Sequence, residues 1–247
     1  MKIHYIFHSG FVVETDEAIL VFDYWRDPAG VMERLAGKKK RAYVFSSHFH
    51  EDHFTKDIFK WREDNPFTDY IYILSKDIRL GHNYLARNGY SDEIKKKITF
   101  VTFDKKYKVD DLNIYTLRSN DAGVAFTVEV DGLKLYHAGD LNWWNTEGRG
   151  ELYGEQYGRE YKRALRHIEN QHFDLGFVVL DPRLGEDGYF LGLDYFIKNI
   201  DCTHIFPMHM WGDYTFIKRF KDRPDIANLR DRIVDIDQEN MIFEIED

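Results

Sequence analysis

Cysteine is almost absent from this 247-residue chain, in which Cys202 is the single thiol. One cysteine excludes an intramolecular disulfide framework, and it also excludes the thiolate clusters that hold structural zinc. We expect Cys202 to be a small buried apolar side chain rather than a nucleophile. Any metal ion that this protein binds must therefore be held by histidine and carboxylate side chains.

Long apolar runs are absent as well. The residues Met1–Phe7 lack the apolar stretch of a signal peptide, and no uncharged apolar run approaches the length that spans a bilayer. Repeats, low-complexity tracts and linkers rich in proline or serine are also missing. These absences predict a single domain over residues 1–247 that is cytoplasmic and does not bind membranes.

Basic residues are outnumbered by acidic ones. Lys and Arg number 34 and Asp and Glu number 43, which gives a net charge of −9. This balance disfavours nucleic acid as a partner, but a small anionic substrate stays compatible because the local charge at a metal site can oppose the net charge. Hydrophobic residues make up 43% of the chain, enough for a packed core. The sequence gives no indication of oligomeric state.

Short apolar or alternating runs predict many strands, and Asp131-Gly132 is a strong signal for a two-residue hairpin turn. The predicted strands cover residues 3–7, 11–14, 18–22, 42–45, 70–74, 98–103, 112–117, 125–130, 133–136, 175–180, 203–206 and 241–245. Helical periodicity covers residues 31–35, 76–88, 188–199 and 214–220, and a stripe at Tyr153, Tyr157, Tyr161, Leu165 and Ile168 predicts a further helix with a core-facing side. Strands in groups with interleaved helices predict two sheets packed face to face with helices outside.

Three imidazoles and two carboxylates fall within the six residues His48 to His53, directly after one of the predicted strands. In an extended segment His48 and His50 point the same way and can bind one cation, while Asp52 and His53 can face a neighbouring one. The alternative is a solvated polar loop, since these residue types are common on surfaces. The density of ligand atoms favours a transition-metal site.

The pattern HxHxDH at His48, His50, Asp52 and His53 resembles the signature of the metallo-β-lactamase superfamily. Further along, Gly139-Asp140 is similar to the family's metal-bridging aspartate motif, and Pro207-Met208-His209 to its last ligand loop. The resemblance implies an α/β fold, a four-layer αββα sandwich of two mixed β-sheets flanked by helices. It also implies a centre for up to two divalent ions, with ligands His48, His50, Asp52, His53, Asp140 and His209.

The opening hairpins resemble a particular branch of that family, the small hydrolases related to ascorbate-phosphate lactonase. In this branch a histidine follows the first strand and an aspartate ends the third, positions that His8 and Asp23 hold here. The resemblance places His8 in the substrate pocket. A capping or core role for His8 is the alternative.

One departure separates this chain from the family, which usually supplies another histidine between the first motif and Gly139-Asp140. The corresponding segment, Thr116–Gly123, contains none. Asn120 or Asp121 can supply an oxygen ligand instead, water can fill the position, or the first site can be weak or empty. An oxygen ligand in place of imidazole favours Mn²⁺ over Zn²⁺, and iron is compatible with the same residues.

Several other polar residues are candidates for supporting roles. His137 precedes Asp140 by three residues, and we interpret it as a group that orients a ligand. Asp181 can support a ligand in the same way, and Arg183 can face an anionic substrate, with a surface ion pair as the alternative. The pair Trp143-Trp144 can line the site or pack against the helix that follows.

Together these features imply a hydrolase in which a metal-activated water attacks a small ester, lactone or phosphoester. Asp52 would be both a ligand and the acceptor of the water's proton. The alternative is a degenerate family member that has lost catalysis with the missing histidine, and that binds a ligand or partner instead.

Overall fold

The computed structural model describes residues 1–35, 37–38, 40–61 and 69–245. These residues divide into two compact units: a first unit of Met1–Thr102 with Asn240–Asp247, and a second unit of Phe103–Glu239. Within the described ranges, no helix is both long and apolar enough to cross a membrane. The single domain expected from the sequence stays a prediction.

A seven-stranded mixed sheet forms the first unit, in the order β13-β1-β2-β3-β4-β5-β6. Neighbours from β13 to β3 are antiparallel, and neighbours from β3 to β6 are parallel. The opening hairpins expected from the sequence are thereby confirmed. The strands are β1 (Lys2–Phe7), β2 (Gly10–Glu14), β3 (Ala18–Phe22), β4 (Arg41–Ser46), β5 (Asp69–Ser75), β6 (Ile98–Val101) and β13 (Ile242–Glu244).

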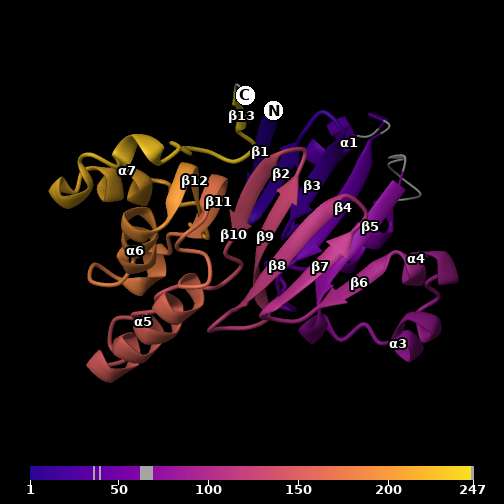
Figure 1. The fold of residues 1–247 in the computed structure, drawn as a ribbon, viewed down its shortest axis with the longest axis horizontal. Coiled ribbons are helices and arrows are strands. Elements are labelled where there is room, and N and C mark those ends of the chain that lie inside the picture. Colours follow the sequence, from indigo (N-terminus) through magenta and orange to yellow (C-terminus); the bar gives the residue numbers. More distant parts are fainter. Residues whose placement is uncertain (36, 39, 62–68, 246–247) are drawn as a thin grey trace. The chain divides into compact units, whose positions relative to one another are not determined.

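Short helices pack on one face of this sheet. Alternate residues of a strand point to the same face, and Val21 and Val44 share a buried cluster with Met32 and Leu35 of helix α1. The helices are α1 (Val31–Leu35), α3 (His82–Arg87) and α4 (Asp92–Lys96), with 3-10 turns at Lys56–Phe59 and Lys76–Ile78. Figure 1 shows α3 and α4 beside the β6 edge. The helix predicted over 76–88 is interrupted between Ile78 and His82, because Arg79 adopts a left-handed φ of 54° and ends the first turn.

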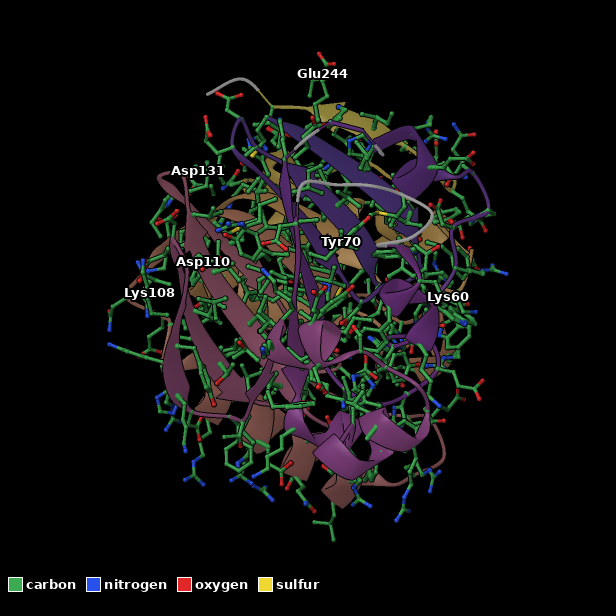
Figure 2. All side chains as sticks on the ribbon, turned by 90° about the vertical axis from the view of Figure 1, so that its right-hand side faces the viewer. Lys60, Tyr70, Lys108, Asp110, Asp131 and Glu244 are labelled. Atoms are coloured by element: carbon green, nitrogen blue, oxygen red, sulfur yellow. The ribbon has the colours of Figure 1, made fainter. Side chains whose placement is uncertain are left out.

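A six-stranded mixed sheet forms the second unit, in the order β12-β11-β10-β9-β8-β7. The neighbours from β7 to β10 are antiparallel, and β10, β11 and β12 are parallel. Figure 2 shows Asp131 at the tip of the β9–β10 hairpin, where Asp131 and Gly132 both have positive φ, as the predicted turn requires. The strands are β7 (Lys105–Val109), β8 (Leu112–Arg118), β9 (Val124–Val130), β10 (Leu133–His137), β11 (His172–Val179) and β12 (Asp201–Met208).

Three longer helices belong to the second unit: α5 (Glu151–Leu165), α6 (Leu191–Asn199) and α7 (Thr215–Lys221). Helix α6 lies beside β11 and β12 (Figure 1), and α5 contacts α6 and β8. The Tyr136 ring stacks on Phe196 of α6 at 5.1 Å. The predicted tyrosine stripe is confirmed as core-facing at its C-terminal end, where Tyr161 is buried and donates a hydrogen bond to the Gly192 carbonyl. Tyr153 and Tyr157 are half-buried.

The strand directions bring polar residues to one end of each sheet. In the first unit β1, β3 and β4 run the same way, so the residues after them, His8, Asp23 and His48–His53, gather at one edge. In the second unit β8, β10, β11 and β12 run the same way, and the residues after them include Asp121, Asp140, Asp181 and His209. Carboxyl ends of parallel strands are where ligand sites form in α/β sheets.

Candidate metal centre

The turn after β4 carries the predicted histidine motif. His48 and His53 are fully buried, and Asp52 is partly open to solvent, with 21% of its side chain exposed. His48 Nε2 lies 2.9 Å from His50 Nδ1, and Asp52 Oδ2 lies 3.8 Å from His53 Nε2. The structure therefore brings the four residues of the motif together within the first unit.

Asp23 organises the motif from behind. Its fully buried carboxylate accepts hydrogen bonds from the Ser47 amide at 2.7 Å, from Ser47 Oγ at 2.6 Å and from His53 Nδ1 at 2.7 Å. Because Ser47 Oγ donates its proton to Asp23, it can only accept from His48 Nδ1, 2.9 Å away. Both His48 and His53 are thus held with the Nδ1 proton, which leaves Nε2 as the ligand atom.

His8 occupies the turn between β1 and β2 and is completely buried. Its Nε2 lies 3.3 Å from Asp52 Oδ2, and its ring meets the His53 ring edge to face at 5.7 Å. One donor atom from each of His8, Asp52 and His53 lies within 4.8 Å of the other two. The structure therefore places His8 against the ligand motif.

The second unit carries the other two predicted ligands. His209 Nε2 lies 3.3 Å from Asp140 Oδ1, and both residues are buried. His209 Nδ1 donates to Asp181 Oδ2 at 2.9 Å, so its Nε2 is again the ligand atom. The two units therefore repeat one device, a buried aspartate that fixes the tautomer of a histidine.

Asp181 is held ionised. Burial opposes its ionisation, but hydrogen bonds from His209 and from Arg183 outweigh burial and lower the pKa of the Asp181 carboxyl to about 2. Arg183 forms a two-pronged ion pair with this carboxylate and stacks on Trp211, with its guanidinium carbon 4.3 Å from the ring centroid. Because 54% of the Arg183 side chain is exposed, the guanidinium also faces solvent.

The segment Thr116–Gly123, which lacks the expected histidine, covers the last residues of β8 and the turn after it. The Asn120 amide donates to the carbonyls of Asn142 and Tyr157 and accepts from the Asn142 amide, so backbone groups occupy it. Asp121 offers a carboxylate oxygen within 4.8 Å of an Asp140 oxygen. Asp121 therefore has a carboxylate oxygen near a predicted ligand, whereas the Asn120 amide is taken up by backbone hydrogen bonds.

The residues around Asp140 hold its turn in place. Buried His137 accepts a hydrogen bond at Nδ1 from the Gly139 amide, 3.2 Å away. Trp144 donates from Nε1 to the Asp140 carbonyl at 3.1 Å, and its ring lies 5.9 Å from His209. Trp143 instead packs on α5 and donates to the Gly154 carbonyl at 2.9 Å. Trp144 therefore lies beside two predicted ligands, Asp140 and His209, and Trp143 packs against the helix that follows.

Cys202 lies apart from this chemistry within the second unit. It is buried in β12, and burial raises the pKa of its thiol to about 12. The side chain packs against Gly176 of β11, where a Cβ would lie 2.9 Å from Cys202 Sγ. The thiol therefore stays protonated and has the packing role that the sequence predicts.

A tight contact between α5 and Trp143 leads to a prediction. A Cβ at Gly158 would overlap the Trp143 indole. We expect Gly158→Ala to lower the free energy of unfolding by about 1–3 kcal/mol in urea titrations, since overpacking outweighs the better helix propensity of alanine. Gln156→Ala on the exposed face of the same helix should change it by less than about 0.5 kcal/mol. Equal stability of the two variants would contradict the tight packing.

The spacing of these donor atoms fits a divalent ion. Two ligands on one tetrahedral ion, with bonds of about 2.0–2.2 Å, have donor atoms roughly 3.3–3.6 Å apart. The 3.3 Å between His209 Nε2 and Asp140 Oδ1 lies in this range. The distances of 2.7 and 2.9 Å from His53 and His209 to their supporting aspartates are instead those of charge-assisted hydrogen bonds. The His209–Asp140 pair therefore fits a metal ion, whereas the 2.9 Å between His48 Nε2 and His50 Nδ1 is the length of a hydrogen bond.

Comparison with known proteins gives one family. The model of the Beta-lactamase superfamily domain matches residues 2–152. A UPF0173 metal-dependent hydrolase from Alkaliphilus metalliredigens is 28% identical over 145 residues, a match that covers 57% of this chain and 63% of the relative. The match thus spans less than two thirds of that relative's length.

Solved structures share the fold. Igni18, a metallo hydrolase from Ignicoccus hospitalis, has 19% identity and a TM-score of 0.63 over 99% of both chains. The metallo-beta-lactamase fold protein YhfI from Bacillus subtilis has 13% identity and a TM-score of 0.57, over 98% of this chain and 99% of that one. The family match covers more than half of the sequence and includes HxHxDH and Gly139-Asp140. The chain belongs to the beta-lactamase superfamily, and its two mixed sheets with their helices form the metallo-β-lactamase fold.

Proposed function

We propose that this protein is a metal-dependent hydrolase with up to two divalent ions per chain. The observation that carries the proposal is the shared tautomer of three histidines, His48, His53 and His209. In each of them Nδ1 donates a hydrogen bond to a buried oxygen. Because the proton of the neutral ring is on Nδ1, Nε2 is unprotonated and can bind a metal ion. The name of the Alkaliphilus relative supports the same activity.

The proposed ligands follow from the donor atoms that each unit presents. In the first unit they are His48, His50, Asp52 and His53, and in the second unit Asp140 and His209. Asp121 is the proposed oxygen ligand that replaces the missing histidine, because its carboxylate lies near that of Asp140. Zinc and manganese are the expected ions, since imidazole nitrogen suits the first and carboxylate oxygen the second.

Ions bound by these ligands would supply Lewis-acid activation of a water and of the substrate oxygen that gains negative charge. Asp52 is the proposed proton acceptor, because its carboxylate is partly open to solvent whereas His48 and His53 are buried. Arg183 presents a half-exposed guanidinium over Trp211, which suits an anionic group on the substrate. The proposed substrates are small esters, lactones or phosphoesters.

Metal removal tests the proposal. We expect the purified protein to contain close to two equivalents of metal and to hydrolyse generic lactones or phosphodiesters. Dialysis against a chelator should abolish turnover, and Zn²⁺ or Mn²⁺ should restore it. Metal analysis and initial rates measure both effects. One tightly held ion without turnover under any metal would instead favour the non-catalytic binding protein that the missing histidine suggests.

A further inference from the structure

His8 is held in an uncommon backbone conformation. It follows β1 with a φ of 58°, and its amide donates to the Tyr5 hydroxyl at 3.0 Å. Few residues other than glycine adopt a positive φ, and those that do are often held there at functional sites. The side chain is completely buried against Trp25, at 5.8 Å between ring centroids, and against His53. The fold therefore aims this imidazole at the ligand motif at a cost in backbone strain.

The distance from His8 to Asp52 is longer than a good hydrogen bond. His8 Nε2 lies 3.3 Å from Asp52 Oδ2, whereas a charge-assisted hydrogen bond between such groups is about 2.7–2.9 Å long. The bond from His53 to Asp23 in the same unit has that shorter length, 2.7 Å. Two ligands on one tetrahedral ion have donor atoms roughly 3.3–3.6 Å apart. The His8–Asp52 spacing is therefore that of two ligands on one ion.

A third donor lies nearby, slightly farther from Asp52 than the spacing given above. His53 Nε2 lies 3.8 Å from the same Asp52 oxygen, and one donor atom from each of the three residues lies within 4.8 Å of the others. We propose that His8 is a metal ligand, which forms with Asp52 and His53 a set of two imidazoles and one carboxylate supplied entirely by the first unit. HxHxDH does not include this histidine. The inference rests on the proposed metal centre and changes its composition.

The added imidazole changes the metal preference of this set. Two nitrogen donors and one oxygen favour zinc, cobalt or iron over magnesium or manganese. Among the other proposed ligands, Asp121 and Asp140 of the second unit are carboxylates, which suit a harder ion. The two ions are therefore expected to differ in affinity for Co²⁺ and Mn²⁺, with the His8 set preferring Co²⁺.

Substitution of His8 by asparagine provides the test. Asparagine tolerates a positive φ, so His8→Asn removes the imidazole without adding backbone strain. In Co²⁺ titrations of the full chain, we expect the variant to bind one of its two ions at least about 100-fold more weakly than the wild type. The reason is that loss of a supporting group behind a ligand already costs about 10–100-fold. His4→Asn is the control, because it removes a comparably buried imidazole from β1 beside Glu14, and it should keep both affinities.

A crystal structure of the wild-type protein with Co²⁺ gives a second measurement that needs no variant. Anomalous scattering should place an ion about 2.0–2.2 Å from His8 Nε2. A structure with two bound ions, in which the ion on Asp52 and His53 lies more than about 3 Å from His8, would overturn this inference. The proposed hydrolase would remain intact. Unchanged Co²⁺ affinities in His8→Asn would do the same. A wild-type chain that binds no Co²⁺ at all would overturn both proposals.

Discussion

Asp140→Asn should abolish hydrolysis while the protein stays folded. The substitution keeps the shape of the side chain and removes its negative charge beside His209 Nε2, 3.3 Å away. Loss of a group that merely supports a ligand costs about 10–100-fold in metal affinity or activity, so loss of a ligand carboxylate should cost more than about 100-fold in kcat/KM. Initial rates on a generic lactone or phosphodiester, with metal content measured on the same sample, check this expectation.

Asp131→Asn provides the matched control for that experiment. Asp131 is exposed at the tip of the β9–β10 hairpin (Figure 2), and its φ of 50° is one that asparagine adopts readily. The same chemical change there should leave turnover and metal content at wild-type values. An Asp140→Asn protein with full metal content and wild-type turnover would remove Asp140 from the proposed ligands.

The sequence predicted the parts of the fold whose residues have strong local patterns. β3 and β4 are continuous apolar runs that are buried along almost their whole length, so their existence and limits were predictable. β7 was missed because its residues Lys105–Val109 include three exposed lysines. Lysines protect an exposed sheet edge from pairing with other chains, and they also hide the strand from a search for hydrophobic alternation.

The candidate ligands were predictable because their spacing within a motif reflects local geometry, as in HxHxDH. Their supporting hydrogen bonds were less accessible to sequence reasoning. Asp23 lies 30 positions before His53, and the contact between them depends on β3 and β4 being parallel neighbours. The role of Ser47 depends on which of its neighbours takes the hydroxyl proton, which only the three-dimensional arrangement reveals. An aspartate directly after a buried strand was the one available signal.

Asp23→Asn is the substitution that should most affect the support of the histidine motif. The new amide would place an NH₂ group toward either Ser47 or His53, where Asp23 now accepts hydrogen bonds. If His53 Nδ1 must accept from that NH₂ group, its proton moves to Nε2, the atom that would otherwise bind metal. We therefore expect metal affinity to fall by about 10–100-fold, as measured by competition with a chromophoric chelator.

The same substitution should change the metal-free protein much less. An amide still forms a hydrogen bond with the imidazole, so the free energy of unfolding in EDTA should fall by only about 1–2 kcal/mol. Asp174→Asn is a suitable control, because this aspartate accepts a hydrogen bond from the Lys134 amide and lies 3.7 Å from His172 Nε2, which is not a proposed ligand. Its metal affinity should match the wild type. If Asp23→Asn also binds metal as the wild type does, the tautomer of His53 does not depend on Asp23. His53 would then no longer support the proposed function, which would rest on His48 and His209 alone.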